Sequence, residues 1–254
     1  MLRVIRLSDG KTGWHRSAAG GLKVAVGTDR LVAVAGDGSA EVVRLADGST
    51  MARGHLAWQP EAQGANSATE LQIGGNAVYT SQDRGDEQAV TAYELDTLHQ
   101  RWRIEQPVGG GMNVCEPVLC LSDATATVAH DAATGEPLWR ADGWTDPWQI
   151  SPGRLLVNTG QLPTTYATVD AETGRMLADL GPGTATRWSL DPFYYLRSAH
   201  TPVSEVSVSR LDPLTGQTRL IGTVGNVFSE QCQASATRLV CPHPDGTLAV
   251  TDVG

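Results

Sequence analysis

The four cysteines are the residues whose type and spacing most directly suggest chemistry. They form two close pairs, Cys115 with Cys120 and Cys232 with Cys241. In a hairpin with a two-residue turn, facing residues share one sum of residue numbers, which puts Pro117 and Val118 in the first turn and Ala236 and Thr237 in the second. Facing strand residues have Cα atoms about 4.5 Å apart, within reach of a disulfide. We therefore expect two disulfides and an oxidising compartment. Four buried thiols in a cytosolic protein are the alternative.

The histidines and carboxylates match no known catalytic or metal-binding motif. The six histidines lack HExxH or HxH spacing, the chain has no GxSxG sequence, and the cysteine spacings do not fit zinc. Residues 81–88 carry Asp83, Asp86 and Glu87, but they lack EF-hand spacing and include Arg84. We expect this stretch to be a solvated hairpin tip. The prediction is that the chain has no catalytic residues, no cofactor and no metal site.

Composition excludes several classes of partner. The net charge is −9 and Lys11 and Lys23 are the only lysines, so the sequence offers no basic stripe for nucleic acid or anionic lipid. No apolar run approaches the roughly 18 residues that span a bilayer, and residues 1–10 lack the apolar core of a secretion signal. Residues 2–7 already alternate like a strand, so we expect a leader or anchor before Met1. We expect this chain to be a monomer that does not insert into a membrane.

A short sequence motif recurs along the chain and indicates that the chain is built from repeats. It consists of an alternating apolar strand, an Asp or small polar residue, a glycine turn and a second strand. The aspartate can accept hydrogen bonds from turn amides, the threonine can add a hydroxyl bond, and glycine permits positive φ. Three copies keep the frame Asp-x-x-Thr-Gly: Asp131, Thr134 and Gly135; Asp170, Thr173 and Gly174; Asp212, Thr215 and Gly216. Shorter copies begin at Leu7, Leu45 and Leu95.

The spacing of this repeated motif predicts the fold class. The copies recur every 35 to 50 residues, which is the length of one four-stranded propeller blade. Complete blades are expected at 21–55, 56–107, 108–143, 144–181 and 182–225, and the two ends of the chain supply the remaining strands. We therefore predict an all-β protein that forms a single β-propeller domain over residues 1–254. Six blades are expected if both ends share one blade, and seven are the alternative.

The most complete copy carries a family resemblance. The residues Ala129-x-Asp131-x-x-Thr134-Gly135-x-x-x-Trp139 resemble the tryptophan-docking motif of the PQQ-like propeller family. That family includes quinoprotein alcohol dehydrogenases and an outer-membrane assembly lipoprotein that is not an enzyme. The resemblance implies that Trp14, Trp102 and Trp139 dock one blade against the next. Ala178 and Leu220 stand in place of the tryptophan in two other copies, so the resemblance identifies the superfold more firmly than any subfamily.

Four further tryptophans are candidates for binding a partner. They are expected at or near the connections between blades, where they would line a rim or simply cap the blade ends: Trp58, Trp144, Trp148 and Trp188. The predicted function is a non-catalytic, extracytoplasmic or secreted scaffold that binds a protein, or alternatively a carbohydrate, on this rim. One alternative is a metal-dependent hydrolase or lactonase that uses Asp142, Asp146 and Asp191. A quinone-dependent dehydrogenase is disfavoured, because such enzymes resemble larger rings and often carry adjacent cysteines.

Overall fold

The structure is a computed structural model with two compact units. It describes residues 1–6, 8–17, 22–58, 69–84, 86–107, 110–123, 125–160, 162–186, 193–198, 205–235 and 237–253. The first unit comprises Met1–Leu121 and His130–Pro137, and the second comprises Ser122–Ala129 and Leu138–Gly254. No helix among the described residues is long and apolar enough to span a membrane.

The first unit begins with a two-stranded sheet and continues with two four-stranded sheets. The two-stranded sheet pairs β1 (Leu2–Ile5) with β2 (Thr12–Arg16). The next sheet contains β3 (Lys23–Val26), β4 (Arg30–Val34), β5 (Ser39–Arg44) and β6 (Thr50–His55). The following sheet contains β7 (Glu70–Gly74), β8 (Ala77–Arg84), β9 (Glu87–Glu94) and β10 (Gln100–Pro107).

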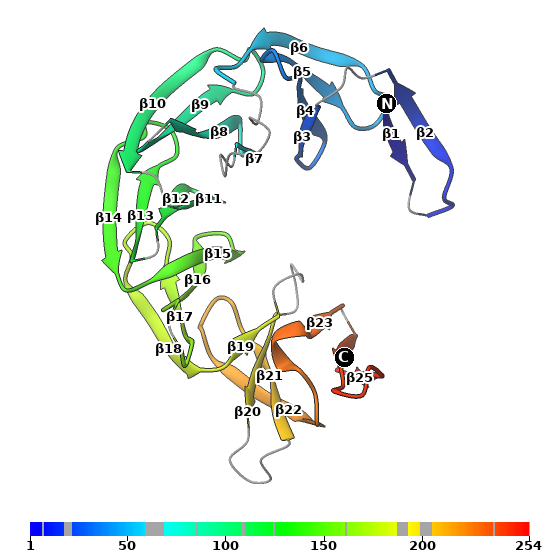
Figure 1. The fold of residues 1–254 in the computed structure, drawn as a ribbon, viewed down its shortest axis with the longest axis vertical. Coiled ribbons are helices and arrows are strands. Elements are labelled where there is room, and N and C mark those ends of the chain that lie inside the picture. Colours follow the sequence, from blue (N-terminus) through cyan, green and yellow to red (C-terminus); the bar gives the residue numbers. More distant parts are fainter. Residues whose placement is uncertain are drawn as a thin grey trace. The chain divides into compact units, whose positions relative to one another are not determined.

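The division between the units runs through the next sheet. It contains β11 (Gly111–Cys115), β12 (Val118–Ser122), β13 (Ala126–Asp131) and β14 (Pro137–Asp142). In this sheet, as in the two before it, the strands lie side by side in chain order (Figure 1). Each sheet is therefore an antiparallel meander that closes its own hairpins before the chain moves on.

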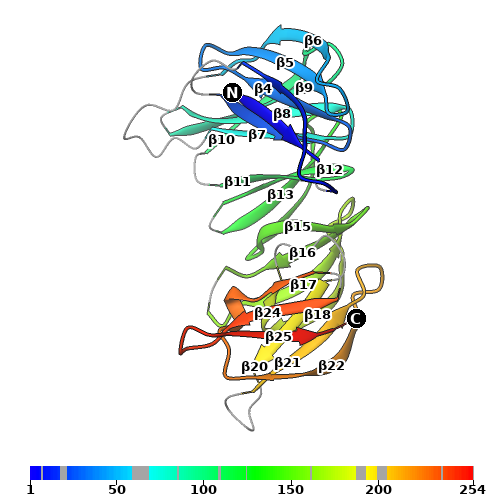
Figure 2. The same cartoon turned by 90° about the vertical axis from the view of Figure 1, so that its right-hand side faces the viewer.

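The second unit repeats this plan. One sheet contains β15 (Thr145–Ser151), β16 (Arg154–Asn158), β17 (Thr165–Asp170) and β18 (Met176–Pro182), shown from another side in Figure 2. The next contains β19 (Thr184–Ala185), β20 (Phe193–Ser198), β21 (Glu205–Leu211) and β22 (Thr218–Gly225). A 3₁₀ helix η1 (Ser229–Gln231) leads into a three-stranded sheet of β23 (Gln233–Ala234), β24 (Arg238–Pro242) and β25 (Leu248–Asp252).

The predicted succession of four-stranded repeats is confirmed. The sheets β3–β6, β7–β10, β11–β14, β15–β18 and β19–β22 match the five expected blades, and only the boundary at Pro182 is displaced, by one residue. The expectation that the chain ends supply the remaining strands is also met, by β1–β2 and β23–β25. That both ends share one blade, giving six blades in a single domain, stays a prediction.

Apolar side chains are buried within and between neighbouring sheets of each unit. In the first unit, Val32, Val42, Val78 and Leu95 belong to one cluster that joins β3–β6 to β7–β10. In the second, Tyr194, Val208 and Leu239 belong to a cluster that joins β19–β22 to β23–β25. The cores therefore form between consecutive repeats, so each sheet needs its neighbour for burial.

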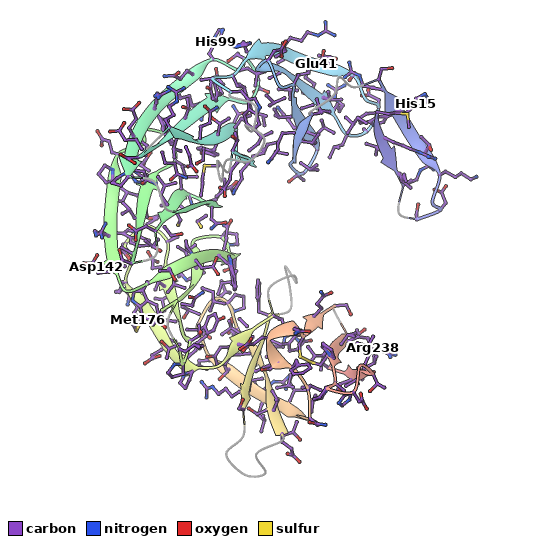
Figure 3. The ribbon with its side chains drawn as sticks, in the orientation of Figure 1. His15, Glu41, His99, Asp142, Met176 and Arg238 are labelled. Carbon is purple, nitrogen blue, oxygen red and sulfur yellow. A yellow bond between two sulfur atoms is a disulfide. The ribbon has the colours of Figure 1, made fainter. Side chains whose placement is uncertain are left out.

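Many of the polar and exposed side chains lie on the outer strand of a sheet or on the strand beside it. Figure 3 labels Met176, on β18, whose side chain is 46% exposed, and Glu41, on β5. Glu41 accepts a hydrogen bond from Arg53 at 2.8 Å and forms a salt bridge of 3.0 Å with Arg16. This carboxylate connects β5 to β2 and β6.

Residues 81–88 differ from the expected solvated tip. Strands β8 and β9 extend to Arg84 and Glu87, and Ser81, Gln82 and Gln88 are buried. Exposed side chains in this stretch are confined to the tip. The pairing of β8 with β9 continues to Arg84 and Glu87, so the polar side chains before the tip lie within the paired strands.

Candidate functional site

In each repeated Asp-x-x-Thr-Gly turn, the aspartate side chain accepts hydrogen bonds from residues of the same turn. Asp170 Oδ1 accepts bonds from the backbone N–H of Thr173 at 3.1 Å and from its hydroxyl at 2.8 Å. Asp131 and Asp212 accept equivalent bonds in their own turns. These bonds lower the pKa of each of the three carboxyls below its usual value, because they stabilise the charged form.

Three indoles lie on the turn of the sheet that follows their own. Trp14 on β2 donates from Nε1 to the carbonyl of Leu45 at 2.7 Å. Trp102 on β10 donates to Ala132 at 3.2 Å, and Trp139 on β14 donates to Ala171 at 2.8 Å. The rings cover the turn glycines, since a Cβ atom on Gly48, Gly135 or Gly174 would lie 2.7–2.8 Å from the ring. Each contact therefore requires both a donor on the indole and a glycine beneath it.

The structure describes three of the four candidate rim tryptophans. Trp58 is half-buried and packs against the apolar cluster that includes Val32 and Leu56. Trp148 lies within β15 rather than in a connection, and it packs against the cluster of Ile150 and Leu156. Trp144 is half-buried in the connection before β15, and Trp188 lies outside the described residues. Their role as a binding rim stays a prediction.

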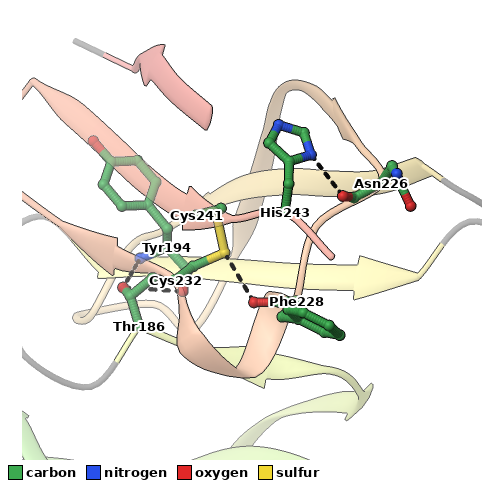
Figure 4. Close-up of a disulfide and its surroundings, with 7 residues drawn as sticks. All are labelled: Thr186, Tyr194, Asn226, Phe228, Cys232, Cys241 and His243. Atoms are coloured by element: carbon green, nitrogen blue, oxygen red, sulfur yellow. Dashed lines mark hydrogen bonds between the residues drawn. A yellow bond between two sulfur atoms is a disulfide. The ribbon is translucent and has the colours of Figure 1, made fainter. Parts of the chain in front are cut away.

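One of the two predicted disulfides is present. Cys232 and Cys241 are bonded, with Cα atoms 4.2 Å apart (Figure 4). The register of β23 and β24 pairs Gln233 with Val240, so the two cysteines face each other as the residue sum requires. Close by, His243 Nδ1 donates to the carbonyl of Asn226 at 2.7 Å. The Cys232–Cys241 disulfide links the residue before β23 to β24 and so fixes the start of the last three-stranded sheet.

The second predicted disulfide is wrong, since Cys115 and Cys120 are buried free thiols. Cys115 ends β11 and Val118 begins β12, so the turn uses Glu116 and Pro117, one residue earlier than expected. With that turn, Cys115 on β11 faces Val118 on β12. Cys120 lies two residues beyond Val118 on β12, so the two cysteines are not directly opposite each other. A hydrogen bond with Cys115, together with burial, raises the pKa of the Cys120 thiol well above its ordinary value.

A groove in the second unit, which we call the second-unit groove, is large enough to bind a partner. It has a volume of about 1500 Å³ and opens among the connections at one end of the sheets β15–β18 and β19–β22. Its lining comes from the start of β15, the loop before β17, the β18–β19 connection, the end of β20 and η1. Neither Trp144 nor Trp148 lines it.

One corner of the groove is organised by a buried amide. Asn158 Oδ1 accepts bonds from the hydroxyl of Thr145 at 3.2 Å and from the N–H of Gly160 at 2.8 Å. Its Nδ2 donates to Asp146 at 3.4 Å. Asp146 has a φ of 48°, in the left-handed region that Asp tolerates better than most residues. The Asn158 amide thus helps to hold this carboxylate at the groove.

Tyr166 and Arg197 also line the groove, and the buried Tyr195 ring packs against both. Tyr166 and Tyr195 meet edge to face with ring centroids 5.8 Å apart, and the Tyr195 hydroxyl donates to the carbonyl of Gly181 at 2.6 Å. The Arg197 guanidinium lies over the Tyr195 ring, 5.1 Å from its centroid, and donates to the carbonyl of Leu180. Burial raises the pKa of Tyr195 to about 12, so this phenol stays neutral and donates.

The groove residues were largely missed by sequence reasoning. Of the three carboxylates considered for a hydrolase, Asp146 lines the groove, Asp142 pairs with Arg140 at 2.7 Å on the surface, and Asp191 lies outside the described residues. A signal for the rest exists in the run Tyr194-Tyr195-Leu196-Arg197, where a strand places a cation two residues after an aromatic ring, on the same face. Across the described parts of the chain, no three His, Cys, Asp or Glu side chains are grouped to hold a metal ion.

Comparison with known proteins identifies the fold. No protein-family model matches the sequence, and no curated protein matches it. Solved structures do match it along almost its whole length, and they include propellers of the PQQ-like and WD40 types. The protein is therefore an all-β chain with a β-propeller fold.

Three of these structures illustrate the likeness. BamB from Moraxella catarrhalis is 14% identical with a TM-score of 0.54, and the match covers 96% of this chain and 74% of BamB. The computationally designed Ika8 protein is 19% identical with a TM-score of 0.60, over 99% of this chain and 77% of that one. A chain of the mitotic checkpoint complex is 12% identical with a TM-score of 0.57, over 99% and 81%. At these identities the likeness shows the fold alone.

Proposed function

We propose that this protein is a non-catalytic, extracytoplasmic propeller of the PQQ-like type that binds another protein through the second-unit groove. The observation that carries the proposal is the groove itself. Its volume of about 1500 Å³ exceeds that of a typical small-molecule pocket, roughly 300–1,000 Å³, and suits a segment of a polymer better.

The rim of the groove is built for contact with another surface. Leu162 lines it on the loop before β17, and its side chain is 90% exposed. Tyr166 and Arg197 also line it, and tyrosine and arginine are among the residue types that carry most binding energy at protein interfaces. Beside three carboxylates, the lining thus offers an exposed leucine, a tyrosine and an arginine for contact with another protein.

The PQQ-like assignment is supported by the indole contacts. The donor contacts of Trp14, Trp102 and Trp139 to the following turns are what a docking motif requires, and they occur at the residues that resemble that family's motif. The match to BamB, a PQQ-like propeller, agrees with it. The Cys232–Cys241 bond supports an oxidising compartment and hence an extracytoplasmic location.

Site-specific photocrosslinking tests the proposal. A benzophenone amino acid in place of Leu162 should capture one discrete protein in the cells that make this chain. The matched control replaces Leu214, which is 65% exposed in the β21–β22 turn of the same unit but does not line the groove. Capture from Leu162 that Arg197→Gln or Glu230→Gln weakens would support the groove. Equal capture from both positions, or none from Leu162, would refute it.

A further inference from the structure

Arg197 occupies an open corner of its sheet. Strand β19 has only two residues, and its last pair with β20 joins Thr184 to Leu196. Arg197 is the next residue along β20 and pairs on its other side with Ser207. The short first strand therefore leaves the guanidinium at the groove rather than under a neighbouring strand.

The guanidinium is held before any ligand arrives. It stacks on the Tyr195 ring and donates to the Leu180 carbonyl, while the Tyr195 hydroxyl is itself tied to Gly181. A cation fixed by stacking and a backbone carbonyl loses little side-chain freedom on binding. Of the five N–H donors of an arginine, one serves Leu180 and another interacts with the Tyr195 hydroxyl, which leaves three for a ligand.

Unlike Arg140 and Arg154 of the same unit, Arg197 has no acidic partner among the described residues. Arg140 pairs with Asp142 at 2.7 Å and Arg154 pairs with Asp170 at 2.9 Å. Among the described residues, no carboxylate lies within the 4.0 Å limit of a salt bridge to Arg197. A positioned guanidinium without an acidic partner is suited to a planar anionic group, which it binds through two parallel N–H bonds.

The other charges of the groove limit what that group can be. Asp146, Asp179 and Glu230 also line it. Two of them already accept bonds, Asp146 from Asn158 at 3.4 Å and Asp179 from the N–H of Gly181 at 2.8 Å. Three carboxylates repel an acidic run, since like charges across an interface are strongly unfavourable. A ligand with one carboxylate among neutral or basic residues would suit both the guanidinium of Arg197 and the three carboxylates of the groove.

We propose that Arg197 anchors a single Asp or Glu side chain of an extended segment of the partner protein. This inference rests on the proposed function and names the recognition element within it. The exposed Leu162 side chain supplies an apolar contact on the same groove, so the partner segment also carries an apolar residue near its carboxylate.

Selection from a phage-displayed random peptide library tests the inference. Panning on the purified wild-type protein should enrich sequences with one conserved Asp or Glu and no second acid beside it. Synthetic peptides of these sequences should bind Arg197→Gln at least about tenfold more weakly than wild type, since a charge-assisted pair contributes that much. Arg197→Lys, which keeps the charge but not the planar fork, should fall between the two.

Two controls make the result specific. Arg175→Gln removes another exposed arginine of the same unit, in the β17–β18 turn and outside the groove, and should leave affinity unchanged. Replacing the peptide's own carboxylate by its amide should cost the same factor as Arg197→Gln, and this change does not touch the protein's stability.

The outcomes separate the inference from the function on which it rests. Enriched peptides that lack a conserved acid, or that bind Arg197→Gln as tightly as wild type, would overturn the carboxylate anchor while leaving a protein-binding groove. Failure to enrich any sequence would count against both, and photocrosslinking from Leu162 would then decide whether the groove binds protein at all.

Discussion

The Nε1 of Trp139 lies 2.8 Å from the carbonyl oxygen of Ala171, and the indole ring covers Gly174 in the same turn. This one contact combines a hydrogen bond, apolar burial and a glycine whose φ of 66° other residues rarely adopt. It joins β14 to the β17–β18 turn, so consecutive repeats are connected at their outer strands as well as through their cores.

Removing this indole should destabilise the second unit measurably. We expect Trp139→Ala to lower the free energy of unfolding by about 3 kcal/mol, and Trp139→Phe by about 1–2 kcal/mol because it keeps a ring but loses the donor. Urea unfolding followed by circular dichroism measures both. The adjacent Leu138→Ala, at a side chain that is 48% exposed, is the control and should cost less than about 1 kcal/mol. Equal losses for all three variants would contradict the docking role.

Leu98 replaces the glycine at one of these turns. Its φ is 58°, its side chain is buried, and a Cβ atom on Gly54 would lie 2.8 Å from it. On β6, Ala52 pairs with Val42 at the point of the register where Trp102 on β10 pairs with Ala92. The Leu98 side chain, which comes from the turn, therefore fills the space that a tryptophan ring of the preceding sheet fills at three other turns.

A double-mutant cycle tests this exchange. Ala52→Trp alone should destabilise the first unit, because Leu98 occupies the space, and Leu98→Gly alone should cost about 2–4 kcal/mol of buried surface, partly offset by relief of the left-handed backbone. The pair together should be more stable than the sum of the two changes by about 1–3 kcal/mol. Additive effects in the measured unfolding free energies would show that the two positions do not share one space.

The repeats could be predicted from the sequence because each turn carries its own local chemistry. The aspartate of a turn bonds to amides two or three residues away, as Asp131 does with Ala133 and Thr134, so the signal lies within a few residues. Blade boundaries then follow from spacing. The prediction for Cys115 and Cys120 failed by the same logic, since a turn displaced by one residue changes the partner of every residue in the strand.

The groove could not be predicted in this way. It brings together Asp146 at the start of β15, Leu162 in the loop before β17 and Arg197 near the end of β20. Their meeting depends on loop paths and on the two-residue length of β19. Alternation of apolar residues fixes which face of a strand is buried, but it does not specify how far a first strand extends. Two of the tryptophans selected for their place near the expected connections, Trp58 and Trp148, pack against apolar clusters of their sheets.

The thiol content of the protein should distinguish its two cysteine pairs. Cys115 and Cys120 are buried, so native protein purified without reductant should resist alkylation, and urea without reductant should expose two thiols per chain. A non-reducing peptide map should show Cys232 linked to Cys241. On the loop-entropy account, reducing that bond should lower stability by about 2–3 kcal/mol. Four thiols in the unreduced protein would contradict both the bond and the extracytoplasmic location.

Acid should destabilise the fold through the turn aspartates. Hydrogen bonds lower the pKa of Asp131 and Asp170 in the folded state, so their contribution is complete above the unfolded pKa of about 4 and is lost as pH falls through the folded value. We expect urea midpoints to be level between about pH 5 and 7 and to fall below about pH 4. Asp170→Asn keeps an acceptor but cannot titrate, so it should reduce the acid-induced fall. Glu172→Gln, at a side chain that makes no hydrogen bond to any described residue, is the control and should leave the acid-induced fall unchanged. An Asp170→Asn profile that coincides with wild type at every pH would show that these turns do not govern acid unfolding.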